Sequence, residues 1–187
     1  MLGLFSRNRA KGGGLIGCRR GSAAVEFAIL APPFLLFMMS TFEVGWFYFA
    51  GSTVDAAAVN AARMVRTGLA QESGLDKQAF NSEVCPILAP LGDCDSRMTV
   101  EVQTFDTFAD LAADVSEPVC ADDDPDDVAD LAYEPGMDNE IVRIRVCFLY
   151  NTINPAIGVN LAETENGRRR MVATHIFRNE PFSRNNS

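Results

Sequence analysis

The stretch Arg19-Arg20-Gly21-Ser22-Ala23-Ala24-Val25-Glu26-Phe27 joins a basic leader to an apolar run that continues to Ala50. Residues 27–42 carry no charge, but a helix of that length spans only about 24 Å of a bilayer core of about 30 Å. Extension beyond residue 42 closes the gap, so we expect a transmembrane helix over residues 22–50. A core helix of a soluble protein and a cleaved secretory signal are the alternatives. The run is too long for either, and no A-x-A cleavage site follows it.

The far end of this helix contains the residues that suit a membrane interface. Trp46 and Tyr48 are placed where amphipathic rings favour the headgroup level. Glu43 then lies about one turn below that interface, where a carboxylate can snorkel or pair. The pair Pro32-Pro33 removes two amide donors, and we expect a kink there.

Charge divides the chain into two unlike parts. The leader holds five basic residues and no acid, whereas the residues beyond Gly51 hold eleven basic and 23 acidic ones, within a total net charge of −9. The positive-inside rule therefore places residues 1–21 in the cytoplasm and residues 52–187 outside it. An outer part this acidic has no basic stripe to neutralise phosphates, so we expect no nucleic acid partner.

Residues Arg20 to Ala28 resemble the N-terminus of the TadE-like family, the pseudopilins of the tight-adherence (Tad or Flp) pilus and secretion system. The resemblance continues through Phe42-Glu43-Val44-Gly45 and Asn60-Ala61-Ala62-Arg63, and the ending Phe177–Phe182 is similar to a frequent ending in this family. It implies a single-pass protein of the bacterial inner membrane with a periplasmic C-terminal domain. The implied partners are other pilins or pseudopilins, the pilus assembly platform and a prepilin peptidase.

The resemblance also implies roles for individual residues. Prepilin peptidase would recognise Gly21, Ser22, Glu26 and Phe27 and cut after Gly21, which makes Glu26 the fifth mature residue. Glu26, and with it Glu43, would then serve subunit assembly, because a carboxylate can neutralise a new α-amino group in lipid. Two alternatives stay open. The leader could be retained, leaving a membrane scaffold subunit of the secretion machine, and Glu26 could simply favour the dipole at a helix start.

The remaining pattern predicts an α+β domain. A helix is expected to continue over residues 51–73, because Val54, Ala58, Ala61, Val65 and Leu69 recur at helical spacing. The domain over residues 74–187 should then contain a short helix, three strands and an acidic loop. The expected ranges are 75–84 for the helix, 98–103, 140–150 and 171–177 for the strands, a helix-capable segment at 106–115, loops at 85–94 and 120–136, and a polar connection over 151–170. A small antiparallel sheet would thus cover a long pilin-like helix.

Four cysteines lie in the outer part: Cys85, Cys94, Cys120 and Cys147. An even number in an oxidising compartment predicts two disulfides with three possible connectivities. Cys85–Cys94 would close a Pro/Gly loop, and Cys120–Cys147 would pin the acidic loop to a strand. No pair has C-x-x-C spacing and the chain has one histidine, so we expect no metal and no cofactor.

The polar segments contain no recognisable catalytic motif. Asp122–Asp127 resembles a calcium loop only in composition, because Asp127 and Tyr133 stand where an EF-hand needs glycine and glutamate. His175 is expected to be structural, and Arg168-Arg169-Arg170 a solvated turn or a contact for an acidic neighbour. The chain lacks G-x-S-x-G, a phosphate-binding glycine loop and H-E-x-x-H, so we expect no enzyme.

Overall fold

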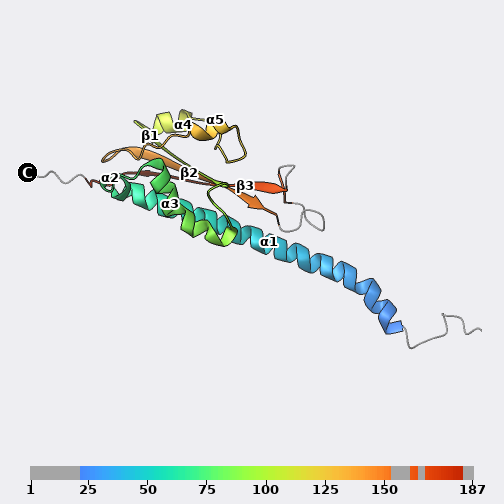
Figure 1. The fold of residues 1–187 in the computed structure, drawn as a ribbon. Coiled ribbons are helices and arrows are strands. Elements are labelled where there is room, and N and C mark those ends of the chain that lie inside the picture. Colours follow the sequence, from blue (N-terminus) through green and yellow to red (C-terminus); the bar gives the residue numbers. More distant parts are fainter. Residues whose placement is uncertain (1–21, 153–160, 164–166, 183–187) are drawn as a thin grey trace, which may run out of the picture.

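The computed structural model describes residues 22–152, 161–163 and 167–182. Its elements are α1 (Ser22–Arg66), α2 (Leu69–Glu72), α3 (Lys77–Leu88), η3 (Ala89–Leu91), β1 (Met98–Phe105), α4 (Phe108–Ala113), α5 (Pro125–Ala129), β2 (Ile141–Asn151) and β3 (Arg168–Arg178). The strands form one antiparallel sheet in the order β1-β2-β3. α1 and α3 lie along one face of the sheet, and α4 and α5 lie over the other (Figure 1). The predicted α+β fold is confirmed.

α1 is a single helix of 45 residues that passes through Pro32 and Pro33. Figure 1 shows that its axis bends in its N-terminal, blue part. Its C-terminal half packs on the sheet through small and β-branched side chains, and the predicted positions Val54, Ala58, Ala61 and Val65 are all buried. Leu69 was expected on the same face, but it is 51% exposed because the helix ends at Arg66 and the chain turns at Gly68, whose φ is +80°.

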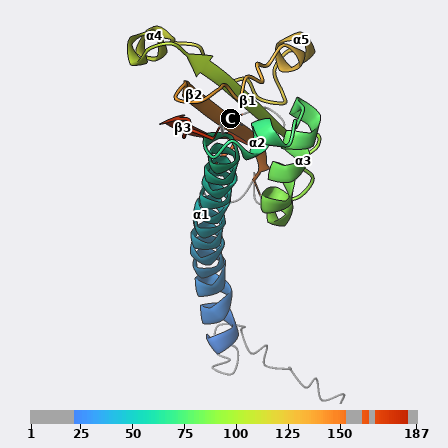
Figure 2. The ribbon, with the colours of Figure 1, turned by 90° about the vertical axis from the view of Figure 1, so that its left-hand side faces the viewer.

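The core fills the space between α1, α3 and one face of the sheet. Val142, Ile144, Val146 and Phe148 alternate along β2 and are fully buried, as period-2 side chains on one face must be. α3 contributes Phe80, Val84 and Leu88, one residue per helical turn. Figure 2 shows α3 beside the domain end of α1, away from the projecting N-terminal half.

Three sequence predictions of local structure are wrong. The segment 120–136, expected as a loop, contains the short helix α5, which Asp124 caps and Pro125 begins. The segment 85–94, expected as a loop, continues α3 through Cys85 and Pro86 to Leu88, because the buried Leu88 holds the last turn against the core. The Arg168–Arg170 tract, expected as a turn, begins β3 and pairs with Asn151, Tyr150 and Leu149 of β2. The expected connection 151–170 therefore ends earlier, and most of it lies outside the described residues.

The C-terminal residues return to the end of α1. Glu180 donates its amide to the Arg66 carbonyl at 2.9 Å, and its carboxylate lies 3.3 Å from the Arg66 guanidinium. Phe182 lies directly against Gly68, where an added Cβ would come within 2.2 Å of the ring. These contacts anchor the far end of the domain to the helix.

Candidate functional site

The residues of the predicted processing signal lie at the very start of α1. Gly21 lies outside the described residues, so the expected cleavage position itself is not part of the structure. Ser22 and Glu26 are one helical turn apart, and the Ser22 hydroxyl donates to the Glu26 carboxylate at 3.0 Å. Phe27 is 73% exposed. The arrangement presents an apolar ring and a carboxylate on a helix that nothing else in the described chain covers.

The N-terminal half of α1 projects from the domain as a bare apolar helix (Figures 1 and 2). No residue from Ser22 to Phe42 is buried, although most are large and apolar. α1 is long and apolar enough to cross a membrane by length and composition. The uncovered part has 21 residues, about 32 Å of helix, which is close to the hydrocarbon thickness of a bilayer.

Burial begins abruptly at Glu43, the only acid in the middle of this helix. Its side chain is 3% exposed, and so is that of Tyr150 near the end of β2. Burial, together with the negative charge of the neighbouring Glu43 carboxylate, raises the pKa of Tyr150 to about 12. Glu43 therefore lies inside its own chain, where the sheet meets the helix, while Glu26 is exposed. A contact of Glu43 with another subunit stays a prediction.

Aromatic and cationic groups surround this junction. The Phe47 ring meets Tyr150 edge-on with the ring centres 6.3 Å apart. The Arg169 guanidinium lies 4.9 Å from the centre of the same Phe47 ring, and it also pairs with Glu163 at 3.1 Å. Arg169 thus stacks on a ring and bridges to a carboxylate. Of the two roles expected for the Arg168–Arg170 tract, a solvated turn or a contact for an acidic neighbour, the structure shows the second.

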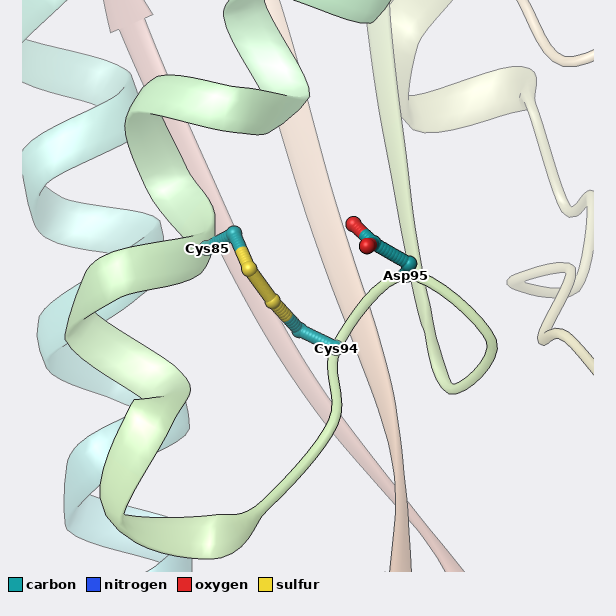
Figure 3. Close-up of side chains that lie close together, drawn as sticks. All are labelled: Cys85, Cys94 and Asp95. Atoms are coloured by element: carbon teal, nitrogen blue, oxygen red, sulfur yellow. A yellow bond between two sulfur atoms is a disulfide. The ribbon is translucent and has the colours of Figure 1, made fainter.

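The cysteines are joined as Cys85–Cys94 and Cys120–Cys147, the two pairs favoured from the sequence. Their Cα atoms lie 5.8 Å and 5.4 Å apart, within the usual range for disulfides. Figure 3 shows the first bond linking α3 to the loop before β1, with Asp95 nearby. The second links the segment over the outer sheet face to β2. Among the described residues, two clusters of cysteine and aspartate are close enough to hold a metal ion, and each includes sulfur from one of these disulfides, so its cysteines are not free thiolates.

The outer face of the sheet is covered by the acidic segment 106–130, which we call the acidic cover. Two β2 arginines beneath it are almost fully buried, Arg143 at 6% and Arg145 at 7% exposed. Arg143 pairs with Asp114 at 2.7 Å, and Arg145 donates to the Ser116 carbonyl at 2.6 Å and pairs with Glu101 on β1. Hydrogen bonds from Ser116 and the Arg143 charge lower the pKa of Asp114 to about 2. The arginines therefore hold the cover onto the sheet.

The aspartate run that suggested calcium has a partner within the chain. Arg170 contacts Asp123 at 2.6 Å and Asp122 at 3.1 Å, so a guanidinium occupies the position where a cation would neutralise these two acids. His175 lies 3.2 Å from Asp55 of α1, a contact between β3 and the helix. The aspartate run and His175 therefore both make contacts that link one element of the fold to another.

Sequence reasoning did not identify Tyr150, Arg143 or Arg145 as key residues. The sequence pattern predicts Tyr150 as the last residue of a strand, and nothing local marks its contact with Glu43, more than a hundred residues away. The two arginines did carry a signal. They alternate with apolar residues on β2, and the segment from residue 98 to 142 contains no Lys, Arg or His but many acids.

Comparison with known families supports the reading of the N-terminal motif. Residues 21–63 match the sequence profile of a family described as TadE-like protein. The resemblance seen in the sequence is confirmed over this segment, which includes nearly all of α1. The similar ending at residues 177–182 lies outside the match. No curated protein and no solved structure matches the chain.

Proposed function

From the TadE-like segment at residues 21–63, we propose that the chain is a non-catalytic pilin-like subunit of a Tad pilus system. It would be held in the bacterial inner membrane by α1, with the leader in the cytoplasm and the sheet domain in the periplasm. Its role would be assembly or initiation of the pilus, and through the pilus, surface adherence. Its partners would be other pilins or pseudopilins, the assembly platform and prepilin peptidase.

The observation that carries this proposal is the division of α1 into two halves. The first half, Ser22–Phe42, is apolar and uncovered, while the second half, from Glu43 to Arg66, forms the spine of a folded domain. One continuous helix thus couples a lipid-soluble rod to a water-soluble head. That is the geometry a subunit needs if it is to move from a bilayer into a filament without refolding.

The start of α1 supports processing at Gly21. Cleavage there would create an α-amino group on Ser22, one turn from the Glu26 carboxylate that already accepts from the Ser22 hydroxyl. A carboxylate at that distance can neutralise the amino group within the bilayer, where an uncompensated charge is costly. The two disulfides fit an oxidising periplasm.

A second function rests on the basic leader. If Gly21 is not cut, five positive charges stay on the cytoplasmic side and oppose extraction of the helix. The chain would then be a permanent single-pass scaffold of the secretion machine. Both functions share the same fold and topology.

Intact-mass measurement of the protein from membranes and from sheared surface fibres, without reductant, separates the two. We expect a chain that begins at Ser22 and carries two disulfides, and its presence in fibres would make it a filament subunit. A Gly21→Glu variant should keep the leader and be absent from fibres. A wild-type chain that begins at Met1 and occurs only in membranes would contradict the pilin role and support the scaffold.

A further inference from the structure

The two outer strands of the sheet, β1 and β3, differ in whether the backbone groups of their outer edges are hydrogen-bonded. The edge of β1 is closed by Ala132–Glu134, because the Val102 amide donates to the Ala132 carbonyl at 2.9 Å and the Glu134 amide donates to the Val102 carbonyl at 2.8 Å. β3 is the opposite outer strand and has eleven residues. Among the described residues, no backbone hydrogen bond closes its outer side between Met171 and Phe177. Within the described part of the chain, β3 therefore presents an open edge.

The middle of this edge lacks the features that usually prevent strand addition. Between Met171 and Phe177 there is no proline, no lysine and no glycine. Val172 is 42% exposed and Ile176 is 50% exposed, and Val59 of the neighbouring helix is 49% exposed. An exposed edge with apolar side chains readily pairs with another extended chain.

A hollow of about 230 Å³ lies beside the distal end of this edge, between β3 and α1. It is lined by Val59, Ala62, Arg63, Arg66, His175, Ile176 and Phe177. Arg66 already has Glu180 and His175 already has Asp55. In the part of the chain that the structure describes, no carboxylate lies within ion-pair distance of Arg63, nor of the exposed Arg178 one residue beyond the hollow. The distal end of the edge thus offers two cations to an incoming acid.

The direction of β3 argues against a second copy of β3 as the partner. Contacts between β3 and α1 advance together, from Arg169 on Phe47 through His175 beside Asp55 to the hollow at Arg66. β3 therefore runs along α1 in the same direction. Two copies anchored in one membrane, as proposed above, would place their β3 strands parallel. In register, that would set the Arg168–Arg170 tracts against each other, and like charges directly opposite are destabilising.

We propose that the open edge of β3 is a strand-addition site for an extended segment of a different protein, running antiparallel to β3. The segment would carry acidic residues that meet Arg63 and Arg178, and apolar residues that cover Val172 and Ile176. Backbone hydrogen bonds to β3 would supply affinity, and the two arginines would supply selectivity for acidic sequences. Such a contact would add a fourth strand without disturbing the core.

The test uses the full chain in nanodiscs and synthetic eight-residue peptides. One peptide places valines beside Val172 and Ile176, and glutamates on its α1-facing side and beside Arg178, which shares the outer sheet face with Val172 and Ile176. A second peptide has lysine in place of each glutamate. The third is the acidic peptide with N-methyl groups on the amides that would donate to β3. Fluorescence anisotropy should show the acidic peptide binding about tenfold more tightly than the lysine peptide, and the N-methylated peptide should not bind. Hydrogen exchange should show new protection of β3 amides between Val172 and Ile176, with β2 unchanged.

Charge variants make the result specific to the site. Arg63→Glu with Arg178→Glu should reverse the preference toward the lysine peptide, whereas Arg63→Lys with Arg178→Lys should keep the preference for the acidic one. Equal binding of the N-methylated peptide, or a preference unchanged by the reversal, would overturn the proposal. Protection, in the chain alone, of the β3 amides that point away from β2 would also overturn it. None of these results depends on cleavage at Gly21, so they leave the pilin proposal separately testable.

Discussion

Gly68 forms the turn that joins the end of α1 to the rest of the domain. Its φ of +80° is unfavourable for any residue with a Cβ, and an added Cβ would lie 2.6 Å from the Phe182 Cβ. We expect Gly68→Ala to lower the free energy of unfolding by about 2–4 kcal/mol, from the left-handed backbone and the clash together. Chemical denaturation of the full chain in detergent would measure it.

Gly74 provides the matched control. Its φ is also positive, at +61°, but a Cβ there would meet nothing within 4 Å. Gly74→Ala should therefore cost only the backbone term, about 1–2 kcal/mol. If the clash with Phe182 matters, Phe182→Ala combined with Gly68→Ala should be less destabilising than the sum of the single changes. Additive costs would show that Phe182 is not packed against Gly68 in solution.

Tyr150 reports on the junction with Glu43. Its pKa is raised from 10.0 to about 12, first by burial and then by the Glu43 charge. Glu43→Gln should lower this pKa, because it removes the charge that opposes ionisation. Ultraviolet titration of tyrosinate would measure the change, with Tyr150→Phe identifying the signal among the three tyrosines. An unaltered Tyr150 titration in Glu43→Gln would refute the contact.

The same shift has a consequence for stability at high pH. Because the folded-state pKa lies above the unfolded value, the contribution of Tyr150 is fully present below about pH 10 and is lost as the pH rises through about 12. Tyr150→Phe cannot ionise at that position. Its unfolding free energy should therefore fall less steeply over this alkaline range than that of the wild type.

At the level of elements, the two disulfides should contribute unequally. Cys120–Cys147 closes a loop with a sequence separation of 27, against 9 for Cys85–Cys94. Loop entropy predicts that replacing Cys120 and Cys147 by serines lowers the free energy of unfolding by about 3–4 kcal/mol. Replacing Cys85 and Cys94 should lower it by about 2–3 kcal/mol. Hydrogen exchange should also localise the effects, because only the loss of Cys120–Cys147 frees the acidic cover and so increases exchange there. Opening of the cover in the Cys85/Cys94 variant instead would contradict this assignment.

The attachment of the acidic cover should also depend on acid pH through Asp114. Its pKa is lowered from 3.8 to about 2 by Ser116 and Arg143, so its contribution is present above about pH 4 and is lost as the pH falls through about 2. Asp114→Asn should weaken the cover near pH 6 and flatten the acid dependence of unfolding between about pH 4 and 2. An acid slope identical to that of the wild type would mean that other carboxylates control the transition.

The elements differ in how far the sequence could predict them. β2 and the buried face of α1 follow from periodicity, because Val142 to Phe148 alternate and Val54 to Val65 recur at helical spacing. The disulfide pairing could be favoured from the sequence because each pair would close or attach a predicted loop. The end of α3 and the start of β3 did not, because Pro86 and Arg168–Arg170 locally favour loops and are overruled by contacts made elsewhere in the chain. Local propensity cannot report a long-range partner such as Glu43 for Tyr150.

At the scale of the whole molecule, the folded domain itself determines how much of α1 is free to enter lipid. The sequence placed the end of the span near Ala50, from hydropathy and the interfacial preference of Trp46 and Tyr48. In the structure the sheet covers the helix from Glu43 onward, and the 21 uncovered residues before it suffice for a bilayer. The domain would then rest on the membrane surface, with Phe47, Tyr150 and Arg169 at its base.

Cysteine labelling in membranes tests this boundary on the intact protein. The background is Cys18→Ser, in which the remaining cysteines are in disulfides. A single cysteine is introduced at Leu35, Tyr48 or Ser52, and each variant is treated with a membrane-impermeant maleimide. All three side chains point away from the domain in the structure, so differences in labelling report lipid rather than protein burial. Leu35→Cys should stay unlabelled and Ser52→Cys should react. Tyr48→Cys decides between the two positions of the bilayer edge. Its reaction would place the edge before residue 48 in the sequence, as the burial of Glu43 requires. Its protection together with labelling at Ser52 would place the edge at about residue 50 and require the base of the domain to dip into the headgroups.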